Sequence, residues 1–227
     1  METQFRAIDR VGIELEGAWK SARRDIRMIH DGSVTDFSGS VMDNCRTGEV
    51  VSEPFTYWSD LVAFIQSKYP DHINRTCGLH VHMSTPTIGA YEALMNQRYN
   101  DFLMKSLLLW GKKNKVQPNH SFWRRMSGTE YYCRGIFRPD EQVNLNMKGS
   151  PRYSQLNYCY GLHRTLEVRV LPMFKQKNLA ISAIYHILRC TQKYLTLPNA
   201  FKDDLSTVEV IVEEQPFIMD FVSKAGV

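Results

Sequence analysis

The stretch Cys77-Gly-Leu-His-Val-His-Met-Ser84 decides the fold. After the glycine, His80 and His82 alternate with apolar residues, which is the pattern of a β-strand that has one apolar face. Because successive side chains of a strand point to opposite faces, both imidazoles lie on the same face. We therefore expect a strand that packs on the core with one face and presents two histidines on the other.

Two other segments show the same alternation with charged residues, namely VGIELEG at 11–17 and TLEVRV at 165–170. In each, apolar residues occupy one face of the predicted strand and charged residues the other. The charged residues are Glu14, Glu16, Glu167 and Arg169. If the three strands pair in one sheet, their polar faces form a wall of carboxylates, imidazoles and a guanidinium.

The composition predicts one globular domain that spans residues 1–227. Hydrophobic residues make up 43% of the chain and charged residues 23%, which is enough to build a packed core. The net charge of +4 is too small to indicate a dedicated nucleic-acid-binding protein. The charge is unevenly distributed, because eight basic residues and one acid lie between Lys105 and Arg138.

Cysteine content and hydropathy predict a soluble, cytoplasmic protein with no membrane partner. The five cysteines are odd in number and form no C-x-x-C pair, so we expect free thiols in a reducing compartment. The N-terminal residues lack the apolar run of a signal peptide. No segment approaches the roughly 18 consecutive apolar residues of a transmembrane helix.

Periodicity predicts an α+β fold, with a mainly antiparallel sheet backed on one face by about two or three helices. Strands are predicted at 8–17, 23–29, 49–54, 77–84, 141–147, 155–159 and 165–172. Helices are predicted at 57–69, 87–110 and 179–195, with Thr56 or Ser59 capping the first and Gly111 ending the second. Residues 34–46 are predicted as a loop, and 112–138 as a basic loop or lobe over the sheet. The acidic tail from Asp203 fits a helix or a strand.

The paired acids Glu14 and Glu16 point to a bound cation. Glutamate is disfavoured in strands, and neighbouring carboxylates on one face repel each other unless a divalent ion neutralises them. Taken singly, these acids, the histidines and the Glu167–Arg169 pair also fit an ordinary strand surface. Together with Glu49, they place four acids, two imidazoles and an arginine on four predicted strands. Because carboxylates predominate, the set favours Mg²⁺ or Mn²⁺ over Zn²⁺.

Three arginines add donors that suit phosphate oxygens, namely Arg152, Arg164 and Arg169. Metal ligands combined with phosphate-binding arginines are the apparatus of phosphoryl transfer. The chain has no Walker P-loop, no G-x-G-x-x-G motif and no G-x-S-x-G motif. The residues therefore point to metal-dependent phosphoryl transfer.

Six segments, in this order, resemble the amidoligase family. They are GIELE at 12–16, DGSV at 31–34, EVVSEP at 49–54, CGLHVH at 77–82, RYSQLN at 152–157 and TLEVR at 165–169. This family belongs with glutamine synthetase and γ-glutamylcysteine ligase among the carboxylate–amine ligases. The resemblance covers roughly residues 10–195, and it implies a curved antiparallel sheet of the glutamine-synthetase type, lined with metal ligands.

The resemblance also implies an activity and a role for each matching residue. ATP phosphorylates a substrate carboxylate, and an amine attacks the acyl phosphate to give an amide, with Mg²⁺ or Mn²⁺ as cofactor. By position, the metal ligands are Glu14, Glu16, Glu49, His80 and Glu167. The phosphate-binding or catalytic residues are His82, Arg152, Arg164 and Arg169. Thr165 occupies the position at which glutamine synthetases have an arginine, and the resemblance implies that the neighbouring Arg164 takes over its role. The substrate end is lined by Asp31, Ser33 and Ser52.

Other functions fit parts of the same pattern. A metal-dependent phosphohydrolase or nuclease would use the same acids. A nucleic-acid-binding module would use the basic, aromatic segment 110–138, where Trp123, Tyr131 and Tyr132 could stack on bases. In a ligase, residues 112–138 are instead the expected lid that shields the acyl phosphate from water. The expected partners of a ligase are an acid and an amine, such as an amino acid, a polyamine or a group on a macromolecule, and the pattern is compatible with an oligomer.

Overall fold

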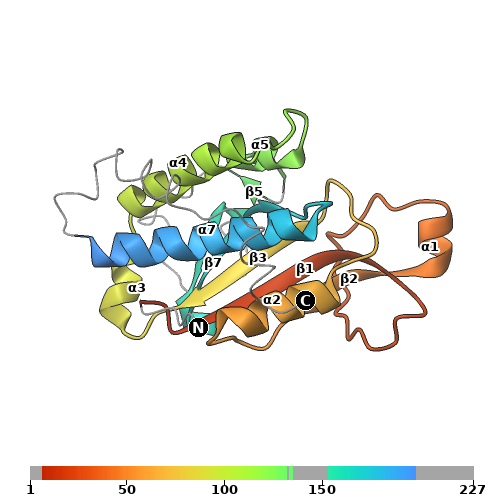
Figure 1. Ribbon diagram of the computed structural model, residues 1–227, viewed down its shortest axis with the longest axis horizontal. Coiled ribbons are helices and arrows are strands. Elements are labelled where there is room, and N and C mark those ends of the chain that lie inside the picture. Colours follow the sequence, from red (N-terminus) through yellow and green to blue (C-terminus); the bar gives the residue numbers. More distant parts are fainter. Residues whose placement is uncertain (1–6, 132, 135–152, 198–227) are drawn as a thin grey trace.

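The computed structural model describes residues 7–131, 133–134 and 153–197 and has an α+β fold (Figure 1). The main strands are β1 Arg10–Lys20, β2 Cys45–Val51, β3 Gly78–Ser84, β6 Leu156–Cys159 and β7 Thr165–Pro172. In the part of the chain that is described, these five strands form a wholly antiparallel sheet in the order β2-β1-β3-β7-β6. The predicted α+β class with a mainly antiparallel sheet is confirmed.

The helices are α1 Ser40–Asn44, α2 Trp58–Lys68, α3 Ile88–Leu94, α4 Gln97–Lys113, α5 Ser121–Met126, α6 Tyr160–His163 and α7 Lys177–Thr196. Figure 1 shows the long helix α7 between α4 and α2, in front of β1, β3 and β7. Two short strands, β4 Thr129–Glu130 and β5 Cys133–Arg134, pair with each other apart from the main sheet. Helices α2, α4 and α7 thus form a layer over one face of the sheet.

The core lies between this helical layer and the apolar face of the sheet. Its strand residues, which alternate along β1, β3 and β7, are fully buried: Val11, Ile13, Leu15, Leu79, Val81, Leu166 and Val168. They pack with buried side chains of the helices, such as Leu61, Leu103 and Ile184. Burial of this apolar surface is the main stabilising term, and it fixes which face of each strand points inward.

The strand register brings the polar residues together on the opposite face. On β1, Glu14 lies opposite His80 of β3, and Glu16 lies opposite Glu49 of β2. On the other side of β3, His82 lies opposite Glu167 of β7. The polar wall predicted from the alternation of three separate segments therefore exists, and β2 adds an acid to it.

β7 contains a β-bulge opposite His80. Leu79 pairs with Leu171 and Val81 pairs with Val168, so β3 advances by two residues while β7 advances by three. The extra residue lies at positions 169–170, and a bulge of this kind bends the strand and re-aims a side chain. The bulge therefore separates the Arg169 position from the regular ladder.

Residues 87–110 form two helices, not the single helix that their periodicity predicts. α3 ends at Leu94 and α4 begins at Gln97. Asn96 lies between them, and its Oδ1 accepts the backbone N–H of Tyr99 at 2.9 Å. Asparagine side chains compete for backbone N–H groups in this way, so they favour helix starts over helix interiors.

The predicted helix stop at Gly111 is wrong, and in the loop or lobe predicted at 112–138 the described residues form regular elements rather than a continuous loop. α4 continues to Lys113, and α5 and the β4–β5 pair follow. Gly111 instead permits close packing, because a Cβ atom there would lie 2.5 Å from the Phe122 ring. The glycine therefore marks the contact between α4 and α5.

No strand forms at 23–29, in contrast to the prediction. Within residues 23–29, only Ile29 forms a β-type pairing, an isolated bridge with Glu49. The guanidinium of Arg23 donates hydrogen bonds to backbone carbonyls at the end of α2, which hold the segment in turns. The predicted loop at 34–46 contains the short helix α1.

The helices predicted at 57–69 and 179–195 are confirmed as α2 and α7, with ends that differ by one or two residues. Neither Thr56 nor Ser59 caps α2, because Tyr57 precedes its first residue and no side chain accepts a capping hydrogen bond there. Burial of Leu61 and Ile65 thus stabilises α2 without a cap.

Two further predictions, the strand at 141–147 and the tail from Asp203, lie outside the described residues. The five cysteines are free thiols, as predicted. Within the described ranges, no helix is long and apolar enough to cross a membrane.

Candidate active site

Glu14 lies at the centre of the polar face, between the two histidines of β3. Its Oε2 lies 2.8 Å from Nδ1 of His80, and its Oε1 lies 3.0 Å from Nε2 of His82. Burial raises the pKa of the Glu14 carboxyl, but its interactions with the two imidazoles outweigh burial and hold this pKa well below its usual value. Glu14 is therefore an ionised carboxylate at neutral pH.

His80 is enclosed by three carboxylates and is only 2% exposed. Besides its contact with Glu14, its Nε2 lies 3.6 Å from Oε1 of Glu16, and its Nδ1 lies 3.5 Å from Oε1 of Glu167. These acids belong to β1 and β7, the strands on either side of β3. The imidazole thus links the acids of the two neighbouring strands.

Glu16 is held in place by the start of β3. Its Oε2 accepts the backbone N–H of Gly78, and the residue is 3% exposed. A Cβ atom at Gly78 would lie 2.6 Å from Nε2 of His80, so only glycine leaves room for the imidazole here. The glycine that precedes the histidines in the sequence therefore shapes the site as well as the strand.

Glu167 is fixed by partners on both sides of its carboxylate. Arg169 donates to Oε1 through Nη1, and Asn157 of β6 donates to Oε2 through Nδ2 at 2.7 Å. Burial raises the pKa of the Glu167 carboxyl, but the charges of Arg169 and His82 outweigh it and lower this pKa. The alternation of residues along the chain does not indicate a role for Asn157. Only the pairing of β6 with β7, which sets it opposite Glu167, gives it one.

His82 is oriented by Thr165, the first residue of β7. The Nδ1 atom of His82 lies 3.2 Å from Oγ1 of Thr165, which leaves Nε2 directed at Glu14. Burial lowers the pKa of His82, but its contacts with Cys159 and Glu14 outweigh burial and raise this pKa well above its usual value. Thr165 is therefore a positioning residue that the sequence did not indicate.

Two groups of side chains present ligand atoms that lie within 4.8 Å of one another. The first group is Glu14, His82 and Glu167, and the second is Glu16, Asp31 and Glu49. The division differs from the predicted roles in two respects. His82 stands in the first group where His80 was predicted as the ligand. Asp31, predicted for the substrate end, joins the second group.

In the second group, the repulsion between neighbouring carboxylates is not neutralised. Burial and then the nearby charges of Glu14 and Asp31 raise the pKa of the Glu49 carboxyl to about 7. A divalent cation between such carboxylates would relieve this repulsion, and oxygen-rich ligands suit Mg²⁺ or Mn²⁺. The residues present therefore fit the predicted cation.

The three residues predicted for the substrate end lie in two places. Ser33 orients Asp31, whose Oδ1 accepts the Ser33 N–H at 2.8 Å and whose Oδ2 accepts the Ser33 hydroxyl at 2.7 Å. Ser52 lies elsewhere on the sheet, where its Oγ accepts the N–H of Ile13 at 2.9 Å and lines a cavity. The structure does not bring Ser52 into the Asp31 group.

A cavity of about 580 Å³ opens beside Glu14 and His82. Arg10 and Arg164 add positive charge to its wall. Arg164 adopts the left-handed conformation, with φ of 57°, which non-glycine residues rarely do outside constrained sites. The predicted phosphate-binding role of Arg164 is thus compatible with its position, while Arg152 lies outside the described residues.

Most of the aromatic residues of segment 110–138 that are described face inward. Trp110 is fully buried, and Trp123 is half-buried with its Nε1 donating to the carbonyl of Gln117 at 2.9 Å. Tyr131 is exposed, and Tyr132 lies outside the described residues. The stacking surface that a nucleic-acid-binding module would need is therefore reduced, among the described residues, to Tyr131.

A comparison with models of protein families found no match, and neither the curated proteins nor the solved structures gave one.

Proposed function

We propose that this protein is an ATP- and Mg²⁺-dependent carboxylate–amine ligase that forms an amide bond through an acyl phosphate. The observation that carries the proposal is the clustering of carboxylates and imidazoles from β1, β2, β3 and β7 around His80, with Arg169 at its edge. The resemblance of six segments to the amidoligase family supports it, and so does the antiparallel sheet that carries them.

Two groups of this chain would hold the cations. Glu14, His82 and Glu167 form one group, and Glu16, Asp31 and Glu49 form the other. Divalent ions bound there would neutralise phosphate charge that otherwise repels a carboxylate substrate. His80 is the shared support, since it contacts an acid of each group.

The cavity beside Glu14 and His82 is our proposed place for the nucleotide. It adjoins the first group of ligands, and Arg10 and Arg164 can offer guanidinium donors to phosphate oxygens. Val51 and Ile88 line the same cavity and are exposed, so they provide apolar surface for a base. The acid substrate then reaches the γ-phosphate from the side of the second group.

The proposed reaction has two steps. The carboxylate oxygen of the acid attacks the γ-phosphorus of ATP, the bond to ADP breaks, and an acyl phosphate forms. The amine nitrogen then attacks the acyl carbon, phosphate leaves, and the amine loses a proton. In this reaction Arg169, which lies beside Glu167 and keeps its charge at neutral pH, would stabilise the transferred phosphoryl group.

The direct test is ADP release in the presence of Mg²⁺, screened over pairs of amino acids and polyamines. A ligase releases ADP and phosphate at a high rate only when both an acid and an amine are present. Release that needs neither would favour the metal-dependent phosphohydrolase instead. No release with any pair, combined with no binding of Mg·ATP, would refute the proposal.

Replacement of His80 tests the support that it gives to the acids. We expect His80→Ala to weaken Mn²⁺ binding about 10-fold or more, because residues that orient metal ligands contribute this much to affinity. Titration calorimetry with Mn²⁺ measures the affinity. His72→Ala, at an exposed histidine, is the control and should bind as the wild type does. Equal affinity in His80→Ala and wild type would assign His80 to folding alone.

The raised pKa of Glu49 predicts proton release on cation binding. At a pH below this pKa of about 7, the Glu49 carboxyl is mostly protonated, so a cation must displace the proton. At a higher pH the carboxylate is already ionised and free to bind the cation. At a pH near 6, we expect Glu49→Gln to release about one proton fewer than the wild type when it binds Mn²⁺. Calorimetry in buffers with different ionisation enthalpies counts these protons. Equal release from both proteins would contradict a ligand role for Glu49.

A further inference from the structure

Arg125 of α5 carries a positive charge into the interior of the protein. It is only 1% exposed. Its Nη1 donates to the backbone carbonyls of Arg169 and Leu171 at 3.2 and 3.4 Å, and its Nη2 donates to that of Thr76 at 3.2 Å. Removing a guanidinium from water is costly unless its hydrogen bonds are replaced; three main-chain carbonyls replace those of Nη1 and Nη2, while Nε is buried without a hydrogen-bond partner.

Two of these carbonyls flank the bulge in β7. The N–H of Arg169 donates to the carbonyl of Gln155 at 2.9 Å, on the β6 side. Its carbonyl, displaced from the regular ladder by the bulge, is bound by Arg125. The side chain of Gln155 donates in turn to the carbonyl of Arg125 at 2.7 Å. A buried carbonyl without a partner is unfavourable, so Arg125 stabilises the bulge in this form.

The same guanidinium borders the acidic face. A Cβ atom at Gly78 would lie 3.1 Å from Oε2 of Glu16 and 3.2 Å from Nη1 of Arg125, so both groups border this glycine. The carbonyl of Thr76, which Arg125 also binds, lies two residues earlier. Arg125 therefore joins the start of β3 to the bulge of β7.

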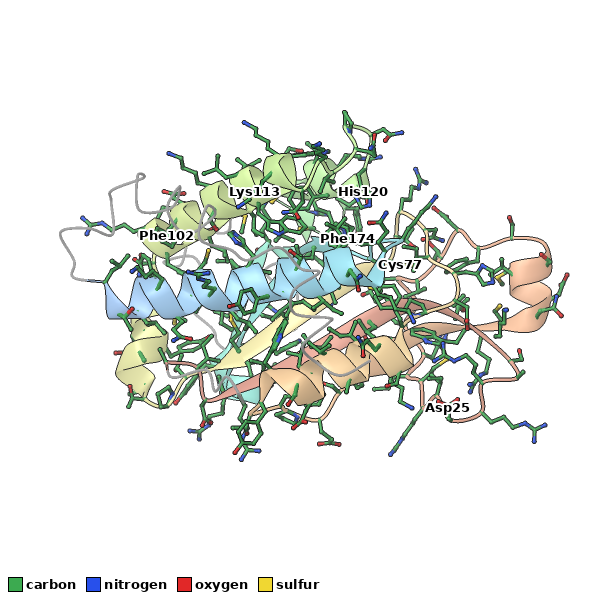
Figure 2. The ribbon with its side chains drawn as sticks, viewed as in Figure 1. Asp25, Cys77, Phe102, Lys113, His120 and Phe174 are labelled. Atoms are coloured by element: carbon green, nitrogen blue, oxygen red, sulfur yellow. The ribbon has the colours of Figure 1, made fainter. Side chains whose placement is uncertain are left out.

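α5 is itself fixed against the end of β7. His120, which precedes α5, stacks on Phe174 with 5.3 Å between ring centroids (Figure 2). A ring nitrogen of His120 accepts the backbone N–H of Phe122 at 3.2 Å, and Phe122 is fully buried. These contacts hold α5 in place, and Arg125 reaches β7 from it.

We propose that Arg125 is a positioning residue, which fixes the bulge of β7 and thereby the direction of the Arg169 guanidinium toward the transferred phosphoryl group. This inference rests on the proposed ligase function. Because Arg125 acts through Arg169, its loss should weaken binding of a mimic of the phosphoryl group in transfer. It should have little effect on the binding of ATP in its ground state.

The test compares binding of Mg·ADP with aluminium fluoride, which mimics the phosphoryl group in transfer, with binding of Mg·ATP. We expect Arg125→Met to weaken binding of Mg·ADP with aluminium fluoride about 10-fold, and binding of Mg·ATP less than about threefold. In an Arg169→Met background, the same substitution should have no further effect on either. Arg125→Lys, which keeps the charge but lacks the planar fork, should give an intermediate loss.

Arg23→Met is the matched control, because Arg23 also donates to two backbone carbonyls, those of Ser67 and Tyr69, away from the site. It should lower the melting temperature without changing either affinity. The positioning role would be overturned if Arg125→Met lowered the affinity for the aluminium fluoride complex equally in the wild-type and Arg169→Met backgrounds, or in neither. Failure of both Arg125→Met and Arg125→Lys to fold would overturn it as well. Absence of Mg·ATP binding in the wild type would overturn the proposed function and this inference with it.

Discussion

Glu16→Gln is expected to lower ADP release at least about 100-fold while leaving the fold intact. The substitution removes one negative charge from the group that contains Asp31 and Glu49, and a loss of a few kcal/mol of charge stabilisation corresponds to this factor. The amide oxygen of glutamine can still accept the N–H of Gly78, so the hydrogen bond that Glu16 makes within the sheet is retained.

Turnover and circular dichroism together measure this prediction. Glu92→Gln, at an exposed glutamate of α3, is the matched control and should keep full activity. The melting temperature of Glu16→Gln should equal or exceed that of the wild type, because one carboxylate leaves a repelling group. Unchanged turnover in a folded Glu16→Gln protein would exclude this acid from the chemistry.

Arg169→Met is the second substitution with a large expected effect. If the proposed mechanism holds, Arg169 stabilises charge that develops during phosphoryl transfer, and we expect turnover at saturating ATP to fall about 100-fold or more. Affinity for Mg·ATP should change less than about threefold, since an interaction made mainly in the transition state affects the rate and not the ground state. Glu167 keeps its hydrogen bond from Asn157, which limits the effect on folding.

Single-turnover kinetics and equilibrium binding separate the two quantities. Arg75→Met is the control, because Arg75 is exposed and pairs only with Asp36 at 3.0 Å among the described residues. It should leave both rate and affinity unchanged. A large loss of Mg·ATP affinity in Arg169→Met with little loss of rate would contradict a role in the transition state.

The sequence predicted the strands of the site well because their signal is local. In β1, β3 and β7 every second side chain is apolar, and that alternation is enough to define the inner face. The prediction that Glu14, His80 and Glu167 share a surface followed from it, and the distances bear this out. Helix α7, with its long apolar stripe, was equally predictable.

The errors arose where a local pattern competed with a distant contact. A continuous helical stripe at 87–110 hid the cap of Asn96, which divides it. Gly111 reads as a helix stop, but it serves a contact with Phe122. The lack of periodicity in segment 112–138 suggested a loop or lobe, although Arg125 within it is buried against β7. In each case a side chain decides the structure through a partner that periodicity does not reveal.

By itself the sequence determined which faces of the strands are polar, because that depends only on the alternation of neighbouring residues along an extended chain. Only the tertiary structure decided which polar residues meet. The register set Asn157 beside Glu167, the Asp31 turn joined Glu16 and Glu49, and Arg125 reached the bulge of β7. These contacts join residues that are far apart in the chain, and their geometry is fixed by strand pairing and packing rather than by any local preference.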